Sequence, residues 1–169
     1  MSECPWNDID DALRTLMLNE LGPASTHTTL KLTSVTVTGF IEAALWPVLA
    51  QDFQFPLMFV LPIENQFSPG PHGQSAALLN DAVRSYRLVP IVVGTQDQGR
   101  KDANTIAWRA IKALKASRSI VIPYPESPNT KAFRISIRAD SPFLWPVQAH
   151  TEDSWYVTVP VDIQLTGTL

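Results

Sequence analysis

The sequence predicts a single α+β domain in which a mainly antiparallel sheet is flanked by an N-terminal helix and a central amphipathic helix, with long loops between them. Apolar residues repeat with helical spacing in two stretches, 9–21 and 100–117. Short apolar or alternating stretches typical of strands surround the second helix, most clearly 54–63, 86–95 and 155–165. The chain has 169 residues, enough for one hydrophobic core, so we expect residues 1–169 to form one domain.

The composition limits the classes of function. Charged residues make up 17% of the chain, below the usual fraction of about a quarter, which reflects either ordinary scatter or a surface covered by a partner. The net charge of −3 disfavours nucleic-acid binding. Cys4 is the only cysteine, so no intrachain disulfide can form. A polar, acidic N-terminus and the lack of a long apolar run predict neither a signal peptide nor a membrane span, so we expect folding in a cytosol.

The first helix is predicted from about Ile9 to Leu21. Its apolar side chains follow i, i+3, i+4 spacing, and Asn7 is the expected N-cap. Three aspartates in the first turn suit the positive end of the helix dipole, which we favour over a metal site. Gly22, expected in a left-handed conformation, and Pro23 should end the helix.

The segment after this helix is less regular. Apolar and polar residues alternate along 28–38, and the alternation shifts by one residue between Thr33 and Ser34. This pattern predicts a strand or hairpin arm with a bulge at the shift. Residues 40–52 predict a short helix that is broken near Pro47, because proline lacks the backbone N–H that a helix interior requires.

The stretch 54–63 is almost continuously apolar, which is typical of a strand buried on both faces. We expect Pro56 at its start and Pro62 at its end, because neither residue can donate a hydrogen bond to a neighbouring strand. Residues 64–80 are rich in proline and glycine and predict a long loop, which could reach a neighbouring subunit as an assembly arm.

Another buried strand is predicted at 86–95, with Pro90 indicating a sheet edge or a bulge. The helix over 100–117 carries small alanines on its apolar face, which favours close packing across the sheet. Trp108 lies outside that apolar face, so it is either covered by a loop or an interface anchor.

Arg100 and Lys101 lie at the predicted start of this helix, where positive charge opposes the dipole. Either they contact a partner, or the helix begins after them at Asp102.

The last part of the chain predicts three strands separated by loops. A loop over 139–153 carries Phe143 and Trp145 and is a second candidate assembly arm. The strands are expected at 119–122, 133–138 and 155–165.

No catalytic motif accompanies this layout. His27, His72 and His150 each stand apart from other metal-ligating residues, so a zinc site is not expected. The chain contains neither a glycine-rich phosphate loop nor a nucleophile elbow. A triad formed in space, for example by Ser75, His72 and Asp81, stays open as the enzyme alternative. We expect no catalytic, cofactor-binding or metal-binding residue, and a building block rather than an enzyme.

The order of elements resembles the phage tail terminator family, whose small members cap the tail tube and join it to the neck. The resemblance covers most of the chain but lies in element order rather than in diagnostic residues. It rests on an N-terminal helix at 13–21, an apolar strand that starts with Phe55 and Pro56, a strand at 88–93, a helix across the sheet at 102–116 and a final strand at 155–165. The extra stretch 28–50 and the loops 64–80 and 139–153 depart from the shorter members.

The resemblance implies a homo-oligomeric ring, usually a hexamer, that stops tube growth and meets the neck or connector protein. The tail sheath would be a further partner in a contractile tail, DNA would only pass through the lumen, and neither a cofactor nor a membrane would be involved. The protein would reside in the virion tail or neck, after assembly in the host cytoplasm. The interface candidates are Phe67, Trp108, Phe143, Trp145, Arg100 and Lys101. A neck or head–tail joining protein, and a small adaptor that binds a partner along a sheet edge, remain the alternatives.

Overall fold

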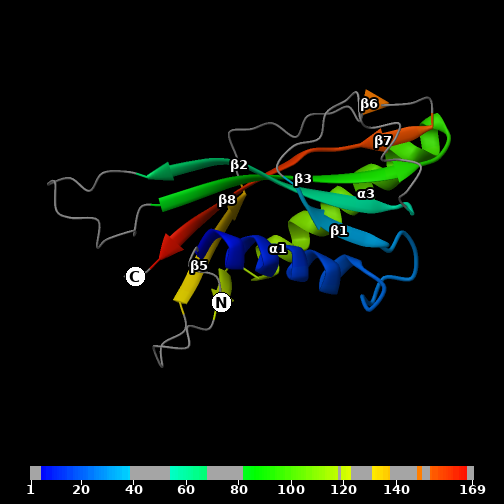
Figure 1. Ribbon diagram of the computed structural model, residues 1–169. Helices are drawn as coiled ribbons and strands as arrows, with labels where there is room; N and C mark the ends of the chain where they lie inside the picture. Colours follow the sequence, from blue (N-terminus) through cyan, green and yellow to red (C-terminus); the bar gives the residue numbers. More distant parts are fainter. Residues whose placement is uncertain are drawn as a thin grey trace, which may run out of the picture.

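The computed structural model describes residues 5–38, 54–67, 82–117, 119–122, 131–137, 148–149 and 153–166. Within these ranges two helices, α1 (Pro5–Leu21) and α3 (Gln96–Ser117), accompany one mixed sheet. Both helices contribute to the core on the same face of that sheet (Figure 1). The prediction of an α+β domain with a mainly antiparallel sheet, an N-terminal helix and a central helix is therefore confirmed.

The sheet is built from eight described strands, with the order β1–β2–β3–β8–β5–β4, while β7 pairs with β3 and carries β6 on its other side. Their bounds are β1 Ser34–Val37, β2 Leu57–Phe67, β3 Ala82–Val93, β4 Ser119–Ile122, β5 Lys131–Ile137, β6 Gln148–Ala149, β7 Ser154–Tyr156 and β8 Val159–Thr166. Among these strands β1 and β2 run parallel, and every other pair is antiparallel.

Helix α1 starts at Pro5, so Asn7 lies inside the helix and its prediction as the N-cap is wrong. Proline is favourable at the first helical position because its φ is already helical and its missing N–H would have no partner there. Gly22 follows the last residue of the helix, but its φ does not lie in the left-handed region, so the predicted left-handed conformation is wrong. A Cβ at Gly22 would approach the carbonyl oxygen of Leu18 to 2.3 Å, so glycine is required by close contact with the preceding turn.

Strand β1 starts only at Ser34, the position of the predicted bulge, and it pairs in parallel with β2 instead of forming a hairpin arm. The prediction of a strand over all of 28–38 is therefore wrong in its first part. Arg14 of α1 donates from Nε to the carbonyl oxygen of Val35 at 2.9 Å, so α1 covers part of this sheet edge. The predicted helix at 40–52 lies outside the described residues.

Strands β2 and β3 form a hairpin that runs to one end of the sheet (Figure 1). The predicted strand end at Pro62 is wrong, because a register shift between Pro62 and Glu64 accommodates the proline and the ladder then resumes. Pairing continues until Phe67 lies opposite Ala82, so the first part of the predicted loop 64–80 is strand. The rest of that loop lies outside the described residues.

Pro90 lies in β3, in the interior of the sheet rather than at an edge. Its missing N–H coincides with an interruption in the neighbouring ladder, because β7 ends at Tyr156 and β8 begins at Val159. In this gap the N–H of Val157 donates to the Pro90 carbonyl at 3.4 Å. The predicted continuous strand 155–165 is therefore two strands.

The remaining strands follow the predictions closely. The short strand expected at 119–122 is β4, and the alternating stretch expected at 133–138 is β5 with slightly shifted ends. The predicted loop 139–153 contains the two-residue strand β6, and most of its other residues lie outside the described part of the chain.

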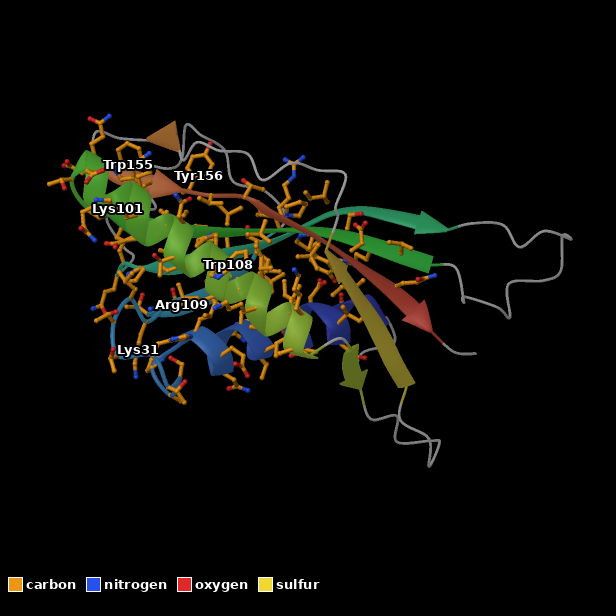
Figure 2. The ribbon with its side chains drawn as sticks, turned by 180° about the vertical axis from the view of Figure 1, so that it is seen from behind. Lys31, Lys101, Trp108, Arg109, Trp155 and Tyr156 are labelled. Carbon is orange, nitrogen blue, oxygen red and sulfur yellow. The ribbon has the colours of Figure 1, made fainter. Side chains whose placement is uncertain are left out.

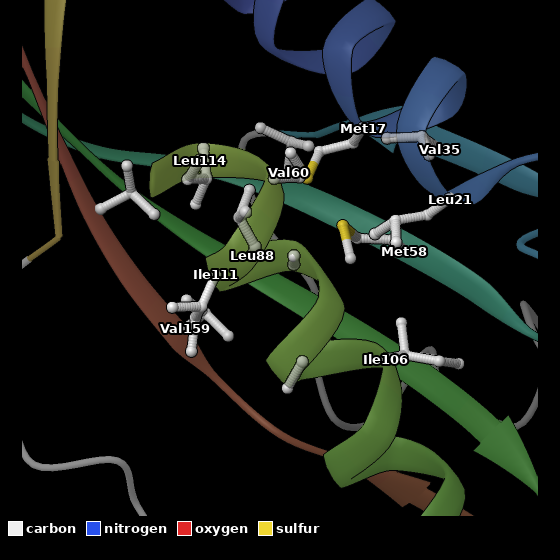
Figure 3. Packing of buried hydrophobic residues seen from close by; sticks show 14 of the residues in the cluster. Met17, Leu21, Val35, Met58, Val60, Leu88, Ile106, Ile111, Leu114 and Val159 are labelled. Atoms are coloured by element: carbon white, nitrogen blue, oxygen red, sulfur yellow. The ribbon is translucent and has the colours of Figure 1, made fainter. Parts of the chain in front are cut away.

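The main core lies between the helices and the sheet (Figure 3). A smaller cluster on the opposite face includes Leu57 and Phe59 of β2, whose neighbours Met58 and Val60 belong to the main core. The prediction that this strand is buried on both faces is thus confirmed for residues 57–60, whereas Ile63 is 49% exposed. The labelled core side chains in Figure 3 are Met17, Leu21, Val35, Met58, Val60, Leu88, Ile106, Ile111, Leu114 and Val159.

Candidate functional site

Helix α3 presents one apolar face to the sheet and leaves Trp108 on its outer side. The face toward the core includes Ala103, Ile106 and Ala110, all at most 1% exposed, whereas Trp108 is 55% exposed. Burying an aromatic ring removes a large apolar area from water, so a half-exposed tryptophan favours a contact surface. Among the described residues no loop covers Trp108, which is consistent with the interface option.

A hollow of about 670 Å³ lies beside Trp108, and we call it the α3 hollow. One wall comes from the end of α1 and the following turn, with Glu20 and His27. The other wall comes from the outer face of α3 and includes Asn104, Trp108 and Lys112, which follow each other at intervals of four residues. This volume lies in the range of ligand-binding pockets, although the hollow is broad and open.

Basic side chains outnumber acidic ones around the α3 hollow. The ammonium group of Lys112 lies 5.7 Å from the centre of the Trp108 ring, within cation–π range. Arg109 donates from Nη1 to the carbonyl oxygen of Thr29 at 2.7 Å, which joins α3 to the segment after α1. Figure 2 shows Trp108 and Arg109 on α3, with Lys31 on the neighbouring segment. A partner with carboxylate groups would suit this arrangement.

Two further wall residues carry polar side chains. Asn104 has a buried side-chain oxygen that finds no hydrogen-bond partner among the described residues. Partial burial lowers the pKa of His27 below its ordinary value of 6.5, and the nearby positive charge of Arg109 acts in the same direction. The imidazole is therefore neutral at neutral pH and adds a hydrogen-bonding group without adding charge.

Arg100 and Lys101 do not line the α3 hollow. Helix α3 starts at Gln96, earlier than predicted, so both cations lie within the helix and pair with Asp97 of its first turn. The nitrogen–oxygen distances are 3.4 Å for Arg100 and 2.6 Å for Lys101, and all three side chains are more than half exposed. The carboxylate of Asp97 offsets the unfavourable position of these two cations at the start of the helix, so their presence there gives no indication of a partner.

The other predicted interface residues lie away from Trp108 or outside the described residues. Phe67 ends β2, and its backbone pairs with Ala82 at the end of the hairpin. Phe143 and Trp145 lie outside the described residues. Among the candidates whose side chains the structure describes, Trp108 belongs to the wall of the α3 hollow, whereas Arg100 and Lys101 do not.

A second polar cluster lies beneath α1. Both carboxylate oxygens of Asp10 accept hydrogen bonds, one from Arg84 Nη2 at 2.9 Å and one from the Tyr86 hydroxyl at 2.5 Å. Partial burial raises the pKa of Asp10 above its ordinary value of 3.8, in opposition to these two contacts. Burial also raises the pKa of Tyr86, and its hydrogen bond to Asp10 acts in the same direction. The cluster ties α1 to β3, so Asp10 has a structural role beyond the expected helix capping.

Within the described residues, no three histidine, cysteine, aspartate or glutamate side chains converge closely enough to hold a metal ion. His72 and His150 lie outside these residues. Neither described helix has the length and hydrophobicity required to cross a membrane.

Comparison with known proteins finds no family model and no curated protein that matches this chain.

Proposed function

We propose that this protein is a bacteriophage tail terminator, a structural subunit that forms a ring on the end of the tail tube. The observation that carries the proposal is Trp108, a large aromatic side chain that is 55% exposed beside an open, positively charged hollow. A subunit whose surface is completed by identical neighbours leaves such anchors uncovered when it is considered alone.

The arrangement of elements also supports this proposal. Helix α1 precedes the apolar strand β2, whose start is preceded by Phe55 and Pro56, and the β2–β3 hairpin leads into α3, which crosses the helical face of the sheet. This is the element order on which the resemblance to tail terminators rests. In this role the ring would stop tube growth and offer its other side to a neck or connector protein.

The test is the mass of the purified protein in solution, measured by light scattering after size exclusion, with and without tail tubes. We expect a hexamer, or a monomer that forms rings only on tube ends. A protein that stays monomeric and ignores tubes would contradict the proposal and favour a monomeric adaptor. Binding to an isolated connector without binding to tubes would instead favour a neck protein.

Trp108→Ala tests the observation that carries the proposal. Because only about half of the side chain is buried, its removal should lower the free energy of unfolding by about 1–2 kcal/mol, too little to unfold the protein, while assembly is lost. Lys101→Ala is the matched control, since this exposed residue of the same helix lies outside the α3 hollow. Equal losses of folding and assembly in Trp108→Ala, or equal assembly of both variants, would refute the role of Trp108.

A further inference from the structure

The charge around the α3 hollow differs in sign from that of the whole chain. The protein carries a net charge of −3, yet Arg109 and Lys112 belong to the wall of the hollow. Lys31 adds charge nearby, held by hydrogen bonds from its Nζ to the carbonyl oxygens of Pro23 and Ser25. Glu20 is the one acidic side chain among the described wall residues. An occupant of the hollow should therefore carry carboxylates.

The start of α1 offers such carboxylates on the same chain. Asp11 is exposed on this helix, one residue after Asp10, whose carboxylate is engaged with Arg84 and Tyr86.

These two surfaces lie too far apart to meet within one subunit. The wall of the hollow includes Glu20 and Leu21, at the end of α1, whereas Asp11 lies near its start. Asp11 and Glu20 are nine residues apart on the same helix, which is about 14 Å along its axis, and Figure 1 shows α1 extended across the helical face of the sheet. Any contact between the two surfaces must therefore join two copies of the chain.

We infer that the α3 hollow is a docking site for a second copy of this chain, and that it receives the acidic start of α1, with Asp11, from the neighbouring subunit. The contact joins two different surfaces, which is the type of contact that a cyclic ring requires. Trp108 would be covered by the incoming helix, and Lys112 would pair with Asp11. This inference rests on the proposed ring and identifies the two surfaces that form it.

Charge reversal at both ends of this contact tests the pairing. Lys112→Glu and Asp11→Lys are made separately and together, and the mass of each variant is measured by light scattering at several protein concentrations, with and without tail tubes. Each single change should weaken association about tenfold or more, because it places like charges opposite each other. The double variant restores opposite charges at every contact and should assemble again.

Two matched controls separate this contact from a general effect of charge. Lys115→Glu reverses a charge on an exposed residue of α3 that lies outside the wall of the hollow, and Asp153→Lys reverses an exposed acid elsewhere. Both controls should assemble like the original protein. Far-UV circular dichroism checks that each variant is folded, so that loss of assembly is not loss of structure.

The outcomes separate this inference from the proposed function. The docking site is supported if the original protein and the double variant form rings and the two single variants do not. If the single variants assemble normally, or the double variant stays as impaired as they are, the inference is wrong while the ring proposal stands. If the original protein forms no ring with or without tubes, both are wrong.

Discussion

The substitution Gly99→Ala tests how tightly the start of α3 packs against the sheet. A Cβ at this position would lie 2.2 Å from Cδ1 and 2.8 Å from Nε1 of Trp155, whose side chain is only 8% exposed. Carbon atoms in contact are normally separated by about 3.5 Å or more, so the indole ring or the helix would have to move by about 1 Å. The ring is rigid, and therefore the added methyl group creates strain.

Two opposing effects determine the size of the change. Alanine is more favourable than glycine in a helix interior by about 1 kcal/mol. Overpacking of a buried site costs about 1–3 kcal/mol and sometimes more. Since an approach of 2.2 Å is severe, we expect the upper part of that range and a net loss of about 1–2 kcal/mol. For a chain of 169 residues this lowers Tm by roughly 3–6 °C.

The assay is urea unfolding followed by far-UV circular dichroism. Gly94→Ala is the control, because a Cβ there would meet backbone atoms of Gly99 at 3.4 Å or more, which requires little movement. In a Trp155→Leu background Gly99→Ala should become neutral or stabilising, since the conflicting ring atoms are absent. If Gly99→Ala is as stable as the original protein, or equally destabilising with and without the indole, the reasoning is refuted.

Three further predictions concern α1 and its attachment to the sheet. Leu13→Ala removes a fully buried side chain and should cost about 2–5 kcal/mol in urea unfolding, and a cost below 1 kcal/mol would contradict this packing. Arg14→Ala removes the hydrogen bond to the β1 carbonyl and should cost about 0.5–1.5 kcal/mol, with faster amide hydrogen exchange in β1 as the specific sign. The raised pKa of Asp10 means that the folded state holds this proton more tightly than the unfolded chain, so its contribution is fully present below pH 3.8 and is lost as pH rises through the folded-state pKa. Relative to Asp10→Asn, the original protein should therefore lose stability in urea unfolding as pH rises over this window. A gain in stability over the same window would contradict a raised pKa for Asp10.

The candidate site was only partly predictable. Trp108 could be placed outside the apolar face of its helix because helical spacing is a local property, and its exposure agrees with that placement. Asn104 and Lys112 share its side of α3 at intervals of four residues, so the same spacing could have indicated them. His27 could not be found in this way, because the turn after α1 meets α3 only in the folded chain.

The failed strand predictions have a common origin in pairing between distant segments. The sequence indicates a strand wherever β-forming residues alternate, but it does not show which segment lies alongside. Pro62 was expected to end a strand, yet a register shift opposite Ser85 lets the ladder continue. Pro90 was expected to mark an edge or bulge, yet it lies inside the sheet and coincides with the division between β7 and β8.

By itself the sequence determined the fold class, both described helices and the approximate positions of most strands, because these depend on short-range spacing of apolar residues. Tertiary structure alone decided the parallel pairing of β1, the salt bridge between Asp10 and Arg84, and the α3 hollow. Asp10 and Arg84 are 74 residues apart, and the walls of the hollow come from two helices between which β1, β2 and β3 lie in the sequence. Such features depend on how distant segments pack, which local residue patterns do not encode.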